Sequence, residues 1–172
     1  MFSKTDIEKY FNAEKAESWV FMAIGITGII LAIVFFFFIK TNLYKGMAIP
    51  LASIGLLLGV VGFTVYKRSD EQRIENVYAY GMNPSFLKNK ELPRMKTVMK
   101  SFIVYRWVEI ILFLVGAGLY IYYIRDFRQD FWRGFGFALA IMALLALAAD
   151  YFAEKRGHIY LKGLESFTSK IS

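Results

Sequence analysis

Four long apolar runs separated by polar segments dominate the pattern of this chain. They cover residues 18–39, 46–66, 102–124 and 134–153, and are 22, 21, 23 and 20 residues long. A helix needs about 20 apolar residues to cross the hydrocarbon core of a bilayer. The pattern therefore predicts an all-α membrane protein with four transmembrane helices, paired as two tandem αα-hairpins at 18–66 and 102–153.

The two predicted hairpins resemble each other in sequence. Shifted by 88 positions, residues 19–68 align without a gap on 107–156, and 12 of 50 positions are identical. Composition alone gives roughly 5 matches in a chain this apolar. The pattern favours duplication of one hairpin, and it predicts a pseudo-two-fold axis along the membrane normal, since a two-span unit keeps its orientation when repeated. The matches include Trp19 with Trp107, Gly46 with Gly134, and Lys67-Arg68 with Lys155-Arg156.

The terminal polar segments, 1–17 and 154–172, are predicted to form short amphipathic helices. Thr5 and Glu8 have the spacing of a capping box, and apolar residues recur at helical intervals in both segments. We expect both helices to lie on the membrane surface. A partner-binding arm is the alternative for the N-terminal segment.

The central polar segment, 67–101, is predicted to be a cytoplasmic loop. Its first part continues the second span as a helix with an apolar face formed by Ile74, Val77 and Tyr78, and this helix ends before Pro84. A segment of this length is too small for an independent core.

The distribution of basic residues predicts the topology. Residues 1–17, 67–101 and 155–172 carry 3, 8 and 4 Lys or Arg, against 5 in the two short loops on the opposite side. Because cytoplasmic flanks collect Lys and Arg, both termini are expected in the cytoplasm. We therefore predict an integral protein of a bacterial plasma (inner) membrane. The net charge of +7 reports this topology, and no nucleic-acid partner is expected.

Composition supports the membrane class and narrows the chemistry. The chain is 57% hydrophobic, above the 45–50% of ordinary soluble domains, and has no cysteine. Thiolate catalysis and disulfides are therefore excluded. The single histidine, His158, lies beside the last span, and no cluster has metal-ligand spacing. We expect a non-enzymatic protein without metal or cofactor.

Basic and apolar residues alternate near the end of the central segment. This pattern indicates docking on anionic lipid, with recognition of an acidic protein or nucleotide as the alternative. The residues are Lys88, Lys90, Arg94, Lys96 and Lys100, with Leu87, Leu92, Met95 and Met99 between them.

Small residues mark the surfaces where helices are expected to approach closely. In membranes, glycines permit such approaches, either within one chain or between copies. The pair Gly55 and Gly59 forms a GxxxG motif, for which homo-oligomerisation is the alternative to internal packing. The predicted packing glycines are Gly25, Gly28, Gly55, Gly59, Gly62 and Gly116.

Acidic residues inside the second hairpin form the candidate site. Arg106 and Glu109 lie in the third span, and Asp150 lies in the fourth. Because i, i+3 residues share a helix face, Arg106 and Glu109 are predicted to form an ion pair that Asp150 or Tyr105 shares. Glu109 is also predicted to face the first span. A proton or cation site at Glu109 is the alternative.

Four spans alone do not select a function. We expect a polytopic protein that binds membrane lipid or a protein partner, as an accessory, assembly or immunity-type subunit. The alternative is a small ion- or proton-coupled transporter or channel that uses Glu109.

Overall fold

The computed structural model describes residues 2–170, and every regular element in that range is helical. Helix α1 (Lys4–Ile33) continues into the π-helical turns η1 (Val34–Ile39), and α2 (Asn42–Met82) returns alongside it. A short connection of α3 (Pro84–Phe86) and η2 (Leu87–Glu91) leads into α4 (Leu92–Tyr123). The 3-10 turn η3 (Phe127–Gln129) then precedes α5 (Asp130–Thr168). The all-helical prediction is confirmed.

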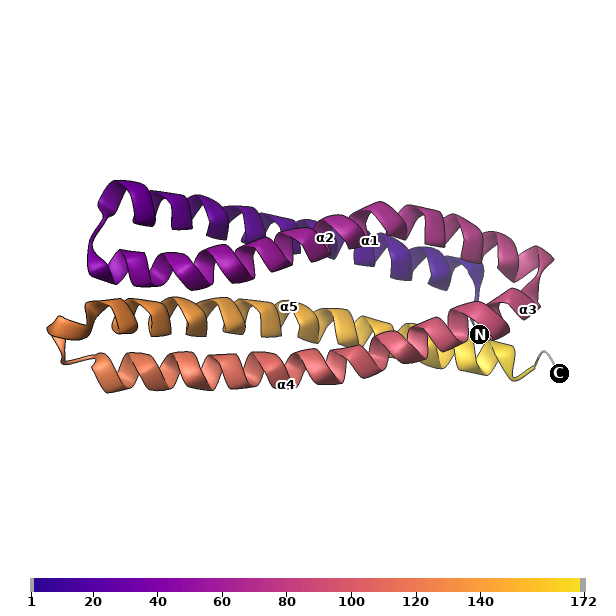
Figure 1. The fold of residues 1–172 in the computed structure, drawn as a ribbon. Helices are drawn as coiled ribbons and strands as arrows, with labels where there is room; N and C mark the ends of the chain where they lie inside the picture. The colour runs from indigo at the N-terminus through magenta and orange to yellow at the C-terminus, as the bar shows by residue number, and fades with distance from the viewer. Residues whose placement is uncertain (1, 171–172) are drawn as a thin grey trace.

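Two tight turns close the hairpins at the same end of the molecule. In the first, Lys40 adopts the left-handed conformation with φ of 60°, and this residue ends η1. The Thr41 hydroxyl then accepts a hydrogen bond from the Tyr44 backbone N–H, which starts α2. Both chain termini and α3 lie at the opposite end (Figure 1).

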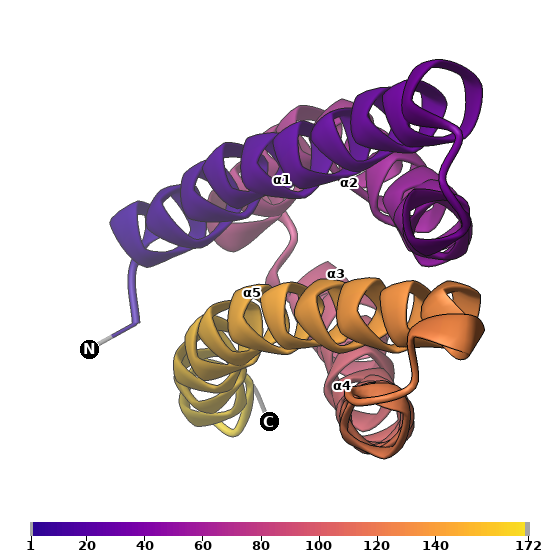
Figure 2. The ribbon, with the colours of Figure 1, turned by 90° about the vertical axis from the view of Figure 1, so that its left-hand side faces the viewer.

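Helices α1 and α2 form one hairpin and α4 and α5 form the other, with α2 packed on α5 between them. The end-on view shows the order α1, α2, α5, α4 (Figure 2). The expected packing of the first span on the third is therefore wrong, because α1 and α4 lie on the outer sides of the two central helices.

Within residues 2–170, four helical stretches are long and apolar enough to cross a membrane, and each is longer than a bilayer requires. They comprise Lys4–Ile39, Asn42–Met82, Pro84–Tyr123 and Phe127–Thr168. The 41 residues of α2 extend about 60 Å at 1.5 Å per residue, against a hydrocarbon thickness of about 30 Å. Residues 67–82, which are 16 of the 41 residues of α2, therefore project past its apolar run.

The projecting ends form a second packed unit, here called the head, comprising residues 2–17, 67–101 and 154–168. The expected surface helices are not separate elements, because residues 4–17 are the first turns of α1 and 154–168 are the last turns of α5. The expected central loop is likewise mostly helix.

The head has an apolar core to which all four long helices contribute. Residues 67–101 are too few to enclose a core, but the two terminal segments complete it. The core residues are Phe2, Ile7, Tyr10, Phe11, Ala79, Leu87, Met95, Met99, Tyr160 and Leu164. A separate core of small and medium side chains lies between the apolar runs and includes Phe21, Ala32, Ala48, Leu51, Leu58, Ala138 and Met142.

Helix α1 starts two residues earlier than its sequence suggested, with Ser3 at the N-cap in place of Thr5. The Asp6 carboxylate accepts hydrogen bonds from the Ser3 backbone N–H at 2.8 Å and from the Ser3 hydroxyl at 2.7 Å. Asp6 thus satisfies a free N–H at the helix start, and the Thr5–Glu8 pairing is not used.

Candidate functional site

The structure brings two of the three predicted intramembrane residues together. Glu109 on α4 and Asp150 on α5 are neighbours across the contact between these two helices. The Glu109 side chain is 9% exposed, and its Oε2 has no hydrogen-bond partner. The pair lies where α4 packs on α5, inside the apolar runs of both helices.

Arg106 does not form the predicted pair with Glu109. Its guanidinium instead forms an ion pair with Glu154 on α5, one turn beyond Asp150. His158 Nε2 lies 3.4 Å from the same Glu154 carboxylate. The i, i+3 spacing within α4 predicted an ion pair that does not form. Helix α5 instead offers Arg106 the carboxylate of Glu154, which lies nearer the polar end of the helix.

Close glycine contacts hold the hairpins together. A Cβ on Gly25 would meet the Gly55 carbonyl oxygen and the Gly59 backbone, and one on Gly62 would meet the Ser18 carbonyl oxygen. In the second hairpin, Gly116 lies equally close to the backbone of Gly136 and Ala140. Gly28 contacts the Leu51 carbonyl oxygen. These contacts lie within the chain, as small residues at helix crossings permit.

Gly59 differs from the other predicted packing residues. A Cβ on Gly59 would meet nothing within 4 Å, and Gly118 is equally open. Gly59 offers its backbone to Gly25 of α1, whereas its side-chain direction faces outward.

Two further glycines join the hairpins to each other near the turns. A Cβ on Gly46 of α2 would overlap the Phe131 carbonyl oxygen of α5. A Cβ on Gly134 of α5 would overlap the Leu43 carbonyl oxygen of α2. The two contacts are reciprocal, and sequence analysis identified both glycines only as matching positions.

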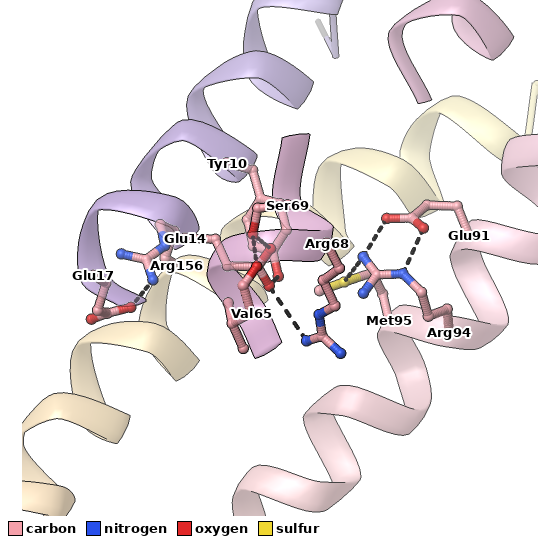
Figure 3. Close-up of polar contacts among 10 residues, drawn as sticks. All are labelled: Tyr10, Glu14, Glu17, Val65, Arg68, Ser69, Glu91, Arg94, Met95 and Arg156. Carbon is pink, nitrogen blue, oxygen red and sulfur yellow. Dashed lines mark hydrogen bonds and ion pairs between the residues drawn. The ribbon is translucent and has the colours of Figure 1, made fainter. Parts of the chain in front are cut away.

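Ion pairs and hydrogen bonds cross between helices where the head meets the apolar runs (Figure 3). Glu17 of α1 pairs with Arg156 of α5, and the Ser69 hydroxyl of α2 donates to Glu14 of α1 at 2.9 Å. These contacts connect three of the four long helices. They fix the position of the head relative to the apolar runs.

A bidentate ion pair is buried in the head at the start of α4. Arg94 donates from Nε and from an Nη to the two oxygens of Glu91, both at 2.7 Å, and Glu91 is 3% exposed. The Arg94 guanidinium also lies over the Phe11 ring, 5.7 Å from its centroid. Arg94 therefore serves the head core rather than a lipid surface.

Two other basic residues of this segment also pair with carboxylates of the head. Lys90 pairs with Glu75 at 2.9 Å, and Lys96 pairs with Glu165 at 3.5 Å. The intervening Leu87, Met95 and Met99 are core residues. The apolar positions of the alternating pattern therefore pack into the head core.

Aromatic stacking joins the two terminal segments. The rings of Tyr10 in α1 and Tyr160 in α5 are parallel within 9°, with centroids 4.1 Å apart. Burial raises the pKa of both phenols above the usual range, so both stay neutral at physiological pH.

One apolar stripe on the head is left uncovered. Ile74, Tyr78 and Met82, at i, i+4 and i+8 on α2, are 63%, 65% and 73% exposed. They border a shallow groove of about 590 Å³ between the start of α1 and the end of α2. Lys4, Glu8 and Arg73 also line this groove. The sequence indicated an apolar face here, but Val77 of that face packs against the head core.

No grouping of three His, Asp or Glu side chains suited to a metal ion occurs within residues 2–170. In comparisons with known proteins, no protein-family model, no curated protein and no solved structure matched the chain significantly. The fold itself defines the class: an all-helical protein of two hairpins, with four helices able to span a membrane and a packed head beyond them.

Proposed function

We propose that this protein is a non-enzymatic membrane subunit that binds a partner protein through the exposed stripe of Ile74, Tyr78 and Met82. The stripe is the observation that carries the proposal. Large apolar side chains that face water in a contiguous row typically mark an interaction surface. The i, i+4, i+8 spacing suits an amphipathic helix of the partner lying in the groove beside α1.

The position of the stripe favours a protein over lipid. Ile74 lies 8 residues beyond Tyr66, the end of the apolar run, and Met82 lies 16 residues beyond it. At 1.5 Å per residue these distances are about 12 and 24 Å along α2. Because electrostatic attraction to a lipid surface decays over a Debye length of about 8–10 Å, the far part of the head is beyond its reach.

The same proposal includes the topology. Both termini and the head lie in the cytoplasm of a bacterial cell, with the protein resident in the inner membrane. The excess of Lys and Arg in the head segments supports this orientation. Reporter fusions after Ser172 and within 85–90 should report cytoplasm, and a fusion within 128–130 should report the opposite side.

We also propose that the two hairpins arose by duplication. The contact of Gly46 with Phe131 and that of Gly134 with Leu43 supports this. Adding 88 to 43 and 46 gives 131 and 134, so each contact is the other with the two copies exchanged. Such reciprocity is the property of a two-fold interface. The axis would run between α2 and α5, along the membrane normal.

Photo-crosslinking in native membranes tests the binding surface. A photo-reactive amino acid at Tyr78 should give one dominant protein adduct. Ile74→Glu or Met82→Glu should abolish the adduct, because a charge in the stripe must be desolvated on binding. The matched control is Ile159→Glu, since Ile159 is 68% exposed on α5 outside the stripe.

The adduct identifies the partner class directly. A different protein crosslinked at position 78 supports an accessory or assembly role. An adduct with a second copy of this chain would indicate homo-oligomerisation in place of that role. Adducts with lipid alone, or an adduct unchanged by both stripe variants, would contradict the proposal.

A second candidate function is proton- or cation-coupled transport past Glu109, which the burial of this carboxyl group inside an apolar run favours. Two shallow hollows lie in the head, away from Glu109, and close backbone contacts at the glycines hold the helices of each hairpin together. Flux in liposomes that Glu109→Gln abolishes would favour transport over binding.

A further inference from the structure

Three charged side chains line the groove beside the exposed stripe of the head. Lys4 and Glu8 come from the first two turns of α1, and Arg73 comes from α2. Lys4 is exposed, and Glu8 and Arg73 are partly exposed. A molecule that covers the stripe therefore meets these charges as well as the apolar row.

The charges of the groove are only weakly satisfied by the chain itself. Within residues 2–170, neither Lys4 nor Glu8 forms an ion pair. The Lys4 ammonium lies instead against Gly81 near the end of α2, where a Cβ would be 3.2 Å from Nζ. Arg73 pairs with Asp70 at 3.7 Å, which is too long for a hydrogen bond. All three groups can therefore accept a partner of opposite charge from a bound molecule.

These charges alternate in sign at intervals close to one helical turn. Helices α1 and α2 run in opposite directions, and Lys4 lies beside Gly81 at the end of the head far from the apolar runs (Figure 1). Glu8 follows Lys4 along α1 by about 6 Å, and Arg73 precedes Gly81 along α2 by about 12 Å, at about 1.5 Å per residue. From the far end toward the apolar runs, the order is positive, negative, positive.

The row of charges thus has nearly the repeat of an α-helix, which rises about 5.4 Å per turn. On the basis of the partner-binding function proposed above, we propose that the groove receives a helix of a different protein with a defined charge pattern. That helix carries an acidic, a basic and an acidic side chain, one turn apart, beside its apolar row. Its two acids pair with Lys4 and Arg73, and its base pairs with Glu8.

The apolar stripe and the charges have different roles in this complex. Burial of Ile74, Tyr78 and Met82 supplies most of the affinity, because ion pairs near a protein surface contribute little net free energy. The charges select among amphipathic helices, since a helix with the opposite pattern brings like charges together.

The charge pattern also disfavours a second copy of this chain as the occupant. A copy related by a two-fold axis along the membrane normal holds each residue at the same depth as its mate. Its groove would therefore face Lys4 with Lys4 and Glu8 with Glu8. A different protein is free of this restriction.

Two synthetic helical peptides with the same apolar row test the proposal on the full chain in lipid nanodiscs. One carries the acid–base–acid pattern and the other carries base–acid–base, with solvent-facing residues that equalise their net charge. By fluorescence anisotropy, corrected for binding to empty nanodiscs, the first peptide should bind at least about ten-fold more tightly at physiological salt. The triple variant Lys4→Glu/Glu8→Lys/Arg73→Glu should invert this preference.

The matched control is Lys9→Glu, which changes the net charge as the triple variant does but lines a different hollow. It should leave the preference unchanged. Lys4→Glu alone should reduce the preference, and because Lys4 is exposed, circular dichroism should stay unchanged. Equal binding of the two peptides, or binding of neither, would overturn the proposal.

Photo-crosslinking at Tyr78 separates this proposal from the function on which it rests. The triple variant should lose the protein adduct, and Lys9→Glu should keep it. If the stripe variants abolish the adduct but the triple variant retains it, the charge pattern is wrong and the binding function stands. A chain that gives no protein adduct at this position would contradict the binding function itself.

Discussion

At the scale of single residues, glycines determine which helix surfaces meet. The backbones at Gly25 and Gly55 touch because neither residue carries a Cβ, and the same holds for Gly116 and Gly136. Gly118 lies only two residues from Gly116 yet faces open space. The sequence thus contains many small residues, but only those at a helix crossing allow two backbones to approach closely.

Gly46→Leu should destabilise the protein by about 1–3 kcal/mol or more, because its side chain would overlap the Phe131 carbonyl of the other hairpin. Gly134→Leu should cost a similar amount, since its contact with Leu43 is the reciprocal one. The measurement is the midpoint of unfolding in SDS–detergent mixtures. Gly118→Leu is the matched control and should leave the midpoint unchanged. Equal midpoints for all three variants would refute the close contact between hairpins.

At the scale of elements, the important feature is that helices continue past the apolar runs. In α1, no breaker separates the polar residues 4–17 from the run that starts at 18, and the backbone stays α-helical to Ile33. Once both terminal segments stand upright beside α2 and α4, they can bury aromatic residues such as Phe11 and Tyr160 against each other. Terminal helices lying on the membrane surface could not form these core contacts.

Spin labels can separate an upright head from surface helices. Labels at Glu8 and at Lys90 should be accessible to a water-soluble relaxation agent and poorly accessible to oxygen dissolved in the bilayer. A label at Phe38, which is 76% exposed on the apolar run, should show the reverse. If the label at position 8 instead behaves like the one at position 38, the N-terminal segment lies in the membrane and the head does not form.

At the scale of the whole molecule, the two hairpins meet through α2 and α5, and the head ties them together a second time. Contacts such as Glu17 with Arg156 and Tyr10 with Tyr160 join α1 to α5 across the two hairpins. The covalent connection between the hairpins is only the short stretch of α3 and η2. Association of the halves therefore depends on packing more than on chain connectivity.

Residues 1–83 and 84–172, co-expressed as separate chains, should therefore co-purify as a one-to-one complex. The cut falls before Pro84, where α2 has ended and no helix is interrupted. Gly46→Leu in the first fragment should weaken recovery of the second, whereas Gly59→Leu should not, because its side chain faces open space. Fragments that never associate would show that the connection is essential.

The sequence by itself determined the all-helical class and the four apolar runs long enough to cross a membrane. In lipid, a run of 20–23 apolar residues is stable as a helix, because a helix forms the hydrogen bonds of its backbone groups within itself. It also supplied the acids Glu109 and Asp150 as candidates, since a carboxyl group inside such a run is costly. These conclusions follow from local properties of the chain.

Only the tertiary structure decided which partners these residues meet. Arg106 is one turn from Glu109 along α4, but α5 brings Glu154 to Arg106 and Asp150 to Glu109. In the same way, Val77 is covered by the head core while Ile74 is left exposed. Periodicity identifies a helix face, but neighbouring helices decide which part of the face is buried, because burial is a property of packing between segments distant in the chain.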